Sequence, residues 1–255
     1  MTGPRRDSGA SLDEVRAAFD GDSHEHVLRL TERMLAERPG DDAAHEFRAR
    51  SLMASGRLEE AERHAQDAVR LDPDEIRYRE LLGQILSTEG AHRDAAAEFA
   101  RLARNDPRQA QWTVAEAKER LGAAQPAMGV EAARRAVTLD PANGEAQLAL
   151  SQALVRMGDA RGAFQAARQA AALLPDDPYA REALADAQWL ADDVVPAFAT
   201  FRALSGELDG ADAARVTAKA RALYRQHAGW AGRLLAAAGP AFRFALRRGW
   251  LRIGK

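Results

Sequence analysis

Small and apolar residues recur along the chain at fixed positions of a 34-residue unit, with polar residues between them. When the units are numbered from Ser8, position 20 is small or apolar in all six: Val27, Ala61, Ala95, Gly129, Ala163 and Ala197. Position 27 follows the same rule: Met34, Ala68, Leu102, Ala136, Ala170 and Leu204. Small residues let two helices cross closely. The pattern therefore predicts a pair of antiparallel helices in each unit.

Proline and glycine fall between these predicted helices. Five prolines lie 34 residues apart, at position 32 of their units: Pro39, Pro73, Pro107, Pro141 and Pro175. Gly56, Gly90 and Gly158 share position 15, where a chain that leaves a helix often needs a positive φ. We expect glycine to form the turn within a unit and proline to mark the turn before the next unit.

The spacing predicts six repeats, over residues 8–41, 42–75, 76–109, 110–143, 144–177 and 178–211. Residues 1–7 are expected to be a disordered N-terminus. An array of repeats needs a last helix with a polar outer face, and residues 212–228 are predicted to supply it, with Ala214, Ala218 and Leu223 facing inward. Residues 229–255 then form a separate tail.

The third unit resembles the tetratricopeptide repeat family at its signature positions: Leu82, Gly83, Leu86, Ala95, Phe99, Leu102 and Pro107. The resemblance extends over residues 8–211 and implies an all-α fold, a right-handed superhelical solenoid of antiparallel helix pairs. One departure concerns position 4, where the family has tryptophan and this chain has polar residues: Ser11, His45, Arg79, Thr113, Gln147 and Arg181.

The resemblance also implies protein binding, in a concave groove lined by the first helix of each unit. Position 9 places a mainly polar line along that groove: Arg16, Arg50, Gln84, Lys118, Gln152 and Asp186. Position 12 adds a mainly apolar line that includes Phe19, Met53, Leu121, Val155 and Trp189. Phe19, Met53 and Trp189 are the expected anchors, whereas Leu121 and Val155 fit the core equally well. A peptide or helix with an apolar strip and acidic residues would suit this surface.

The composition supports a helical, soluble protein. Alanine occupies 58 of the 255 positions, whereas valine and isoleucine together occupy 13, which disfavours β-sheets. The N-terminus has no apolar core of a secretory signal, and no stretch approaches the roughly 20 apolar residues of a membrane-spanning helix. We therefore expect a cytoplasmic protein. The absence of cysteine excludes disulfides and thiolate chemistry.

Charge is distributed unevenly. The formal net charge is −2, yet residues 213–255 carry +10 and residues 1–212 carry −12. In the tail, Phe242, Leu246, Trp250 and Ile253 share one helical face, as in helices that lie in a membrane interface. The residues expected to contact a membrane or a partner are Trp230, Arg233, Phe242, Arg243, Leu246, Arg247, Arg248, Trp250 and Arg252. The tail could instead pack back on the acidic repeats or dock to another protein; nucleic acid is the least favoured ligand, because no nucleic-acid-reading module occurs.

No motif for catalysis, phosphate binding or metal binding occurs, so the sequence predicts no enzyme, no cofactor and no metal. Of the six histidines, only His24 and His26 are near neighbours, and a solvated pair is the favoured interpretation. The favoured function is a non-catalytic scaffold or adaptor that binds a partner segment. The alternatives are a self-assembling repeat protein and an adaptor held peripherally at the inner face of the membrane by its tail.

Overall fold

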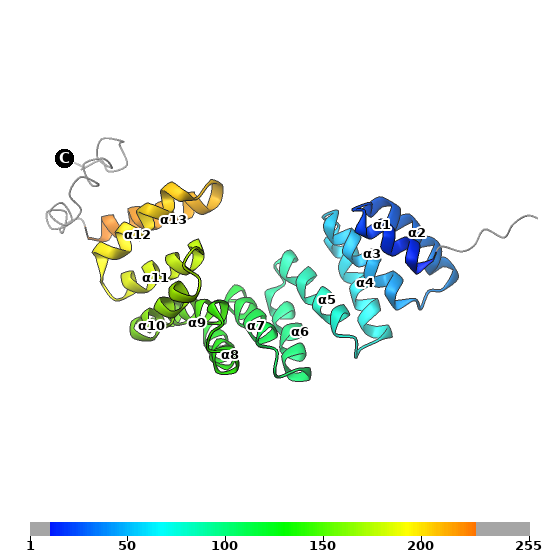
Figure 1. The fold of residues 1–255 in the computed structure, drawn as a ribbon, viewed down its shortest axis with the longest axis horizontal. Helices are drawn as coiled ribbons and strands as arrows, with labels where there is room; N and C mark the ends of the chain where they lie inside the picture. The colour runs from blue at the N-terminus through cyan, green and yellow to red at the C-terminus, as the bar shows by residue number, and fades with distance from the viewer. Residues whose placement is uncertain (1–10, 228–255) are drawn as a thin grey trace, which may run out of the picture. The chain divides into compact units, whose positions relative to one another are not determined.

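The computed structural model describes residues 11–227, and within this range every regular element is an α-helix (Figure 1). The thirteen helices of the described part are α1 (Leu12–Asp20), α2 (His24–Glu37), α3 (Asp42–Ala54), α4 (Leu58–Leu71), α5 (Ile76–Glu89), α6 (His92–Asn105), α7 (Ala110–Gly122), α8 (Pro126–Leu139), α9 (Gly144–Met157), α10 (Ala160–Leu173), α11 (Pro178–Leu190), α12 (Val194–Glu207) and α13 (Gly210–Gln226). The predicted all-α helical repeat fold is confirmed.

The helices follow one another in pairs at the spacing of the prolines. The first helices α3, α5, α7, α9 and α11 begin at residues 42, 76, 110, 144 and 178, each 34 residues after the last. Asp41, Asn143 and Asp177, each two residues after a repeat proline, accept a hydrogen bond from a backbone N–H of the helix that follows. Such caps satisfy amides that have no partner within the helix, so the outer turn both ends one repeat and starts the next.

The turn within each repeat has the same backbone conformation throughout. Gly56, Gly90 and Gly158 have φ values of +74°, +79° and +78°, as expected at position 15. The same position also has positive φ in the three repeats without glycine there: Asp22 at +52°, Ala124 at +56° and Asp192 at +61°. The left-handed conformation is thus set by the helix pair, and glycine only makes it less costly.

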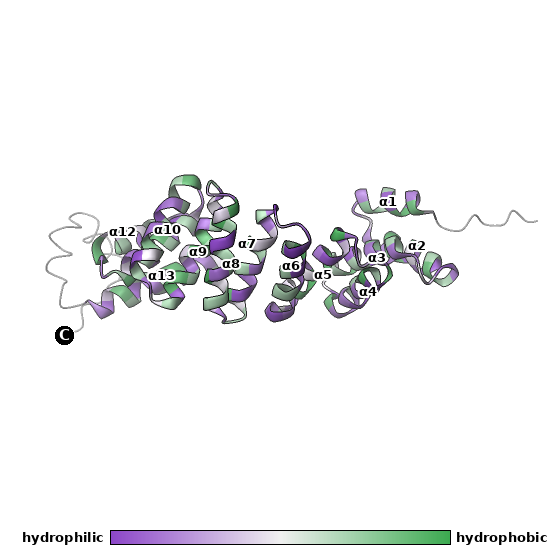
Figure 2. Ribbon diagram, turned by 90° about the horizontal axis from the view of Figure 1, so that it is seen from below, coloured by the Kyte–Doolittle hydropathy of each residue, from purple (hydrophilic) through white to green (hydrophobic). Residues whose placement is uncertain are grey.

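The described residues belong to two compact units. The N-terminal unit ends at Met128, and the C-terminal unit begins at Gly129. In the first unit, one core surrounds Leu81, Ile85 and Leu102, and another surrounds Val15 and Met34. In the second unit, alanines make most of one core: Ala163, Ala167 and Ala187 are fully buried. Hydrophobic and hydrophilic residues are interleaved along the helices (Figure 2). The position-20 alanines Ala61, Ala95, Ala163 and Ala197 are completely buried.

Helix α13 covers the end of the last repeat. Val216 and Leu223 are completely buried and pack with Phe201 and Leu204 of α12. The predicted inward face was wrong at two positions, because Ala214 and Ala218 are exposed. The register is set by the larger side chains: Val216 and Leu223 remove more apolar surface from water than alanine does.

Several sequence predictions lie outside the described residues. These are the disordered N-terminus over residues 1–7, the last residue of the predicted capping helix, and the whole tail with Trp230, Arg233, Phe242, Arg243, Leu246, Arg247, Arg248, Trp250 and Arg252. Among residues 11–227, no helix is both long and apolar enough to cross a membrane.

Candidate partner-binding surface and a buried histidine pair

The first helices of the N-terminal unit present a cationic and aromatic surface. Arg16 of α1 is exposed and forms a loose ion pair with Asp13, at 3.7 Å. The Phe19 ring stands edge-on to the Phe47 ring of α3, with 5.5 Å between centroids, and both side chains are half-buried. An apolar ring that is already held in place but still partly accessible is a suitable anchor for a partner side chain.

Arg50 and Met53 continue this surface on α3. Arg50 is paired with Glu46, at 2.9 Å, and Glu46 is only 4% exposed. Arg77 lies 3.7 Å from the same carboxylate, so Arg50 is the closer of two cations that neutralise this buried group. Met53 is half-buried against the core around Ile85.

In the same unit, the predicted groove residues of α5 and α7 are Gln84, Lys118 and Leu121. Gln84 is exposed and donates a hydrogen bond to Glu80, at 3.2 Å. Lys118 is exposed as well. Leu121 is not part of an open surface, because only 6% of it is exposed. Of the two positions that the sequence allowed for Leu121, the groove and the core, the structure has the core.

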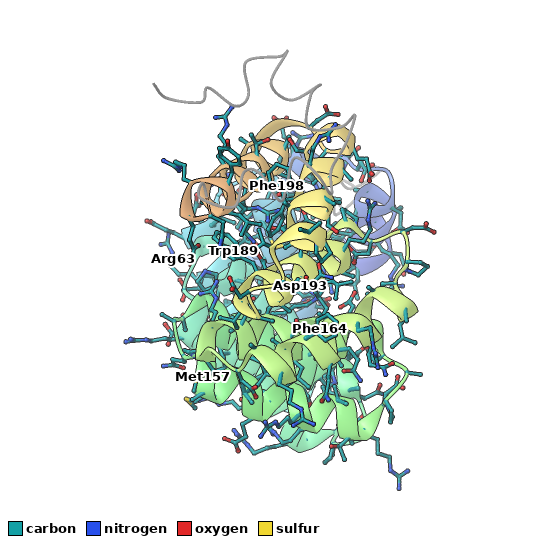
Figure 3. The ribbon with its side chains drawn as sticks, turned by 90° about the vertical axis from the view of Figure 1, so that its left-hand side faces the viewer. Arg63, Met157, Phe164, Trp189, Asp193 and Phe198 are labelled. Carbon is teal, nitrogen blue, oxygen red and sulfur yellow. The ribbon has the colours of Figure 1, made fainter. Side chains whose placement is uncertain are left out.

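In the C-terminal unit, the predicted groove residues are less accessible. Gln152 is half-buried, and Val155 packs against the core formed by Leu154, Ala163 and Ala187. Trp189, labelled in Figure 3, contacts both α12 and α13. Its indole N–H donates to Gln226 of α13, at 3.0 Å, and its ring stands edge-on to Phe201 of α12. The predicted anchor Trp189 therefore has intramolecular partners.

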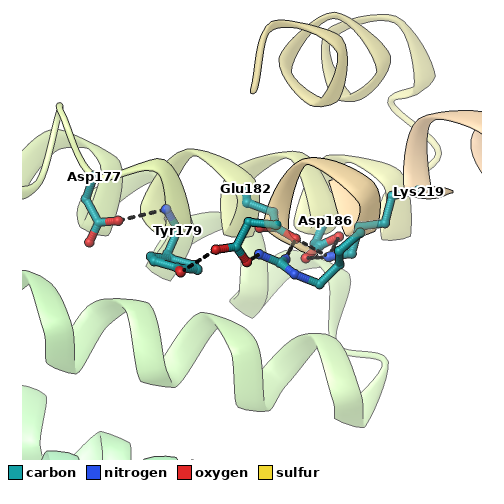
Figure 4. Close-up of polar contacts among 7 residues, drawn as sticks. Asp177, Tyr179, Glu182, Asp186 and Lys219 are labelled. Atoms are coloured by element: carbon teal, nitrogen blue, oxygen red, sulfur yellow. Dashed lines mark hydrogen bonds and ion pairs between the residues drawn. The ribbon is translucent and has the colours of Figure 1, made fainter. Parts of the chain in front are cut away.

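Asp186 belongs to an ionic network between α11 and α13 (Figure 4). Lys219 lies 2.7 Å from Asp186 Oδ1 and 2.8 Å from Glu182, and Glu182 is only 4% exposed. Arg215 pairs with both Glu182 and Asp212, which raises the pKa of its guanidinium. Burial raises the pKa of Asp186, and the Lys219 ammonium opposes that rise. The cations of α13 thus neutralise the acidic side of α11, and Asp186 has its partner within the protein itself.

A buried histidine pair joins α3 to α4. His45 Nδ1 and His64 Nδ1 lie 2.9 Å apart, and His45 is 7% exposed. Arg48 Nε donates to His64 Nε2, at 3.1 Å, and His45 Nε2 lies 3.1 Å from the carbonyl oxygen of Pro39. Burial, followed by the Arg48 charge, lowers the pKa of His64 to about 4.

These contacts assign the protons of both rings. Because His64 Nε2 accepts from Arg48, its proton stands on Nδ1 and is donated to His45 Nδ1. His45 then carries its proton on Nε2 and donates it to Pro39. The chain of donors is complete only when both imidazoles are neutral. Asp67 lies beside it, with Oδ2 3.8 Å from His45 Nδ1.

The sequence analysis missed this pair because the two histidines are 19 residues apart. His45 stands at position 4 and His64 at position 23 of the same repeat. The next repeat has Arg79 and Glu98 at these positions, 2.8 Å apart, and Arg79 also donates to the carbonyl of its repeat proline, Pro73. The sequence signal for this contact was a polar residue at position 4 together with a polar residue at position 23 of the same repeat. The predicted solvated pair differs too: His26 is exposed, but His24 is half-buried against Phe19.

The fold places the chain among the helical-repeat solenoid proteins. A tetratricopeptide repeat family model matches residues 26–85, which include α3, α4 and most of α2 and α5. This match covers the equivalent of two helix pairs, and the whole described chain shares the helical-repeat fold of tetratricopeptide repeat proteins of known structure. No curated protein matches the sequence.

Three solved structures illustrate the likeness of fold. A tetratricopeptide repeat protein from Parabacteroides merdae has a TM-score of 0.69 at 12% identity, over 84% of this chain and 90% of that one. MamA from Desulfovibrio magneticus RS-1 has a TM-score of 0.57 at 18% identity, over 64% of this chain and 92% of that one. YrrB, described as having an unusual peptide-binding site, has a TM-score of 0.53 at 16% identity, over 68% of this chain and 90% of that one.

Proposed function

We propose that the protein is a non-catalytic scaffold that binds a segment of a partner protein on the first helices of its N-terminal unit. The surface consists of Arg16, Phe19, Arg50, Met53, Gln84 and Lys118. Two observations support its use: the surface combines exposed cations with half-buried apolar side chains, and the equivalent Asp186 and Trp189 of the last repeat already have partners on α13. Peptide binding by the similarly folded YrrB accords with this proposal.

The chemistry of the surface defines the expected ligand. Arg16 and Lys118 attract carboxylates, and their exposure means that they contribute mainly to association rate and specificity. Phe19 and Met53 offer apolar area at which a partner side chain can be desolvated. The ligand is therefore an extended or helical segment that combines acidic residues with an apolar strip.

The test is affinity capture from the native host, followed by mass spectrometry. The variant Arg16→Glu with Lys118→Glu should recover at least about tenfold less of a partner that the wild type recovers, because both charges of the surface are reversed. Arg50 is left unchanged, since its reversal would place a second carboxylate beside the buried Glu46. A matched control, Arg93→Glu with Arg104→Glu, makes the same change of charge on exposed residues of α6. Equal capture by wild type and surface variant would contradict the proposal.

The tail carries the alternative functions. A +6 charge over residues 229–255, with tryptophan and arginine interleaved, suits attachment to an anionic membrane surface, where the protein would remain cytoplasmic. A chain that ends after residue 227 separates the possibilities in the same capture. If the tail is the binding element, its removal abolishes capture or moves the protein out of the membrane fraction. If the repeats self-associate, the wild type recovers only itself.

A further inference from the structure

Three metal-binding side chains converge on one point between α3 and α4. One ring nitrogen of His45, one of His64 and an Asp67 carboxylate oxygen all lie within 4.8 Å of one another. The two Nδ1 atoms face each other at 2.9 Å, and Asp67 Oδ2 lies 3.8 Å from His45 Nδ1. His64 and Asp67 stand one turn apart on α4, and His45 faces them from the antiparallel partner helix.

We propose that His45, His64 and Asp67 form a binding site for a divalent transition metal ion, for which zinc(II) is the best fit. Two imidazoles and one carboxylate are a common donor set for zinc, which takes a water molecule as its fourth ligand. Magnesium and calcium prefer sites made of oxygen alone. The proposal is independent of the partner-binding surface, because Arg16 and Lys118 take no part in it.

The two imidazoles need little adjustment, whereas Asp67, whose Oδ1 is now paired with Arg70 at 2.7 Å, must move closer to them. Two nitrogens on one tetrahedral zinc ion lie about 3.3 Å apart, since each bond is about 2.0–2.1 Å long. The imidazoles would therefore separate by roughly 0.4 Å from their present 2.9 Å. His64 and Asp67 are half-buried and leave a path for the ion and its water, whereas the His45 ring is already oriented by its hydrogen bond to Pro39. Metal-bound histidines are held in this way by a carbonyl on the second ring nitrogen.

Arg48 opposes the metal. Zinc on Nδ1 of a neutral imidazole places the ring proton on Nε2, and Arg48 Nε now donates to that atom of His64. Binding would therefore break the Arg48–His64 hydrogen bond, and the guanidinium charge would repel the ion. Arg48 Nη1 has a separate partner, the carbonyl oxygen of Leu28 at 2.8 Å, which can retain the side chain near α2. Removal of the Arg48 charge should strengthen binding.

The experiment is a zinc titration of the untagged full chain, freed of metal with a chelator, by isothermal calorimetry and by competition with a chromophoric chelator. We expect one ion per chain, and the tetrahedral absorption bands when cobalt(II) replaces zinc. His64→Gln should weaken binding at least about tenfold, and Arg48→Gln should strengthen it about tenfold. His26→Gln, a change at an exposed histidine, should leave it unchanged.

The Arg48 variant complements the His64 variant, because it retains all three ligands and is expected to change the affinity in the opposite direction, and its fold is checked by circular dichroism as well. Circular dichroism establishes that His64→Gln retains its helices. The proposal is overturned if zinc does not bind stoichiometrically, if His64→Gln binds as the wild type does, or if Arg48→Gln does not bind more tightly.

Discussion

Single residues decide how polar groups are tolerated inside this alanine-rich fold. His45, Thr113 and Gln147 occupy buried position-4 sites where the family has tryptophan, and Arg79 is half-buried at the same position. A buried polar group is unfavourable unless it is hydrogen-bonded. His45 and Arg79 solve the problem in the same way, by donating to the carbonyl of the repeat proline and by pairing with position 23.

The histidine pair makes the stability of the metal-free protein depend on pH. The folded pKa of His64, about 4, is below its unfolded value near 6.5, so the neutral form stabilises the fold. This contribution is fully present above pH 6.5 and is lost as the pH falls from 6.5 towards 4. Because His64 is only half-buried, we expect a loss of about 1–2 kcal/mol, less than the full shift implies.

Urea unfolding at pH 7.5 and pH 5, with a chelator present, measures this loss. His64→Gln should show a smaller fall in the free energy of unfolding between the two pH values than the wild type shows. His26→Gln serves as the control, since His26 is exposed. An equal loss of stability in the wild type, His64→Gln and His26→Gln would contradict the assignment of neutral imidazoles to the hydrogen bonds that link Arg48, His64, His45 and Pro39.

The two helices of each repeat are joined by a turn at position 15. The backbone φ at this position is positive in all six repeats, although the residue differs. Ala124 holds a φ of +56° at the position where Gly158 holds +78°. An L-residue in this region costs about 1 kcal/mol or more relative to glycine. Ala124→Gly should therefore raise the free energy of unfolding by about 0.5–1 kcal/mol, which chemical denaturation can measure.

The reverse change is the matched control for that turn. Gly158→Ala should lower the free energy of unfolding by about 1 kcal/mol, because a Cβ at Gly158 meets nothing within 4 Å and only the backbone conformation opposes it. Destabilisation by Ala124→Gly, or no effect of Gly158→Ala, would show that the positive φ at position 15 is not what limits these turns.

At this scale the sequence was most informative. Prolines 34 residues apart and small residues at position 20 were enough to predict helix pairs, because both follow from local geometry. The register of α13 could not be predicted in this way. Its apolar residues fit more than one face, and contacts with Phe201 and Leu204 select the one that buries Val216 and Leu223. The same reason explains Leu121, whose burial depends on neighbouring helices and not on its own repeat position.

In the molecule as a whole, the N-terminal unit offers the more open first-helix surface. Their repeat positions predicted that Asp186 and Trp189 are groove residues. In the structure, Asp186 accepts a hydrogen bond from Lys219 of α13, and Trp189 donates one to Gln226 of α13. The sequence predicted the last helix, but not that its Lys219 and Gln226 would pair with Asp186 and Trp189 of the last repeat. Binding by this protein is therefore expected to depend on Arg16, Phe19, Met53 and Lys118.

Site-specific photo-crosslinking tests that central claim most directly. A photoreactive amino acid is placed in the native host at position 16 or 118, or at control positions 93 or 104 on α6, and crosslinked proteins are identified after irradiation. The account predicts that positions 16 and 118 crosslink to the same partner protein and that the controls do not. Crosslinking of that partner only from positions 93 and 104, or equally from all four, would contradict it.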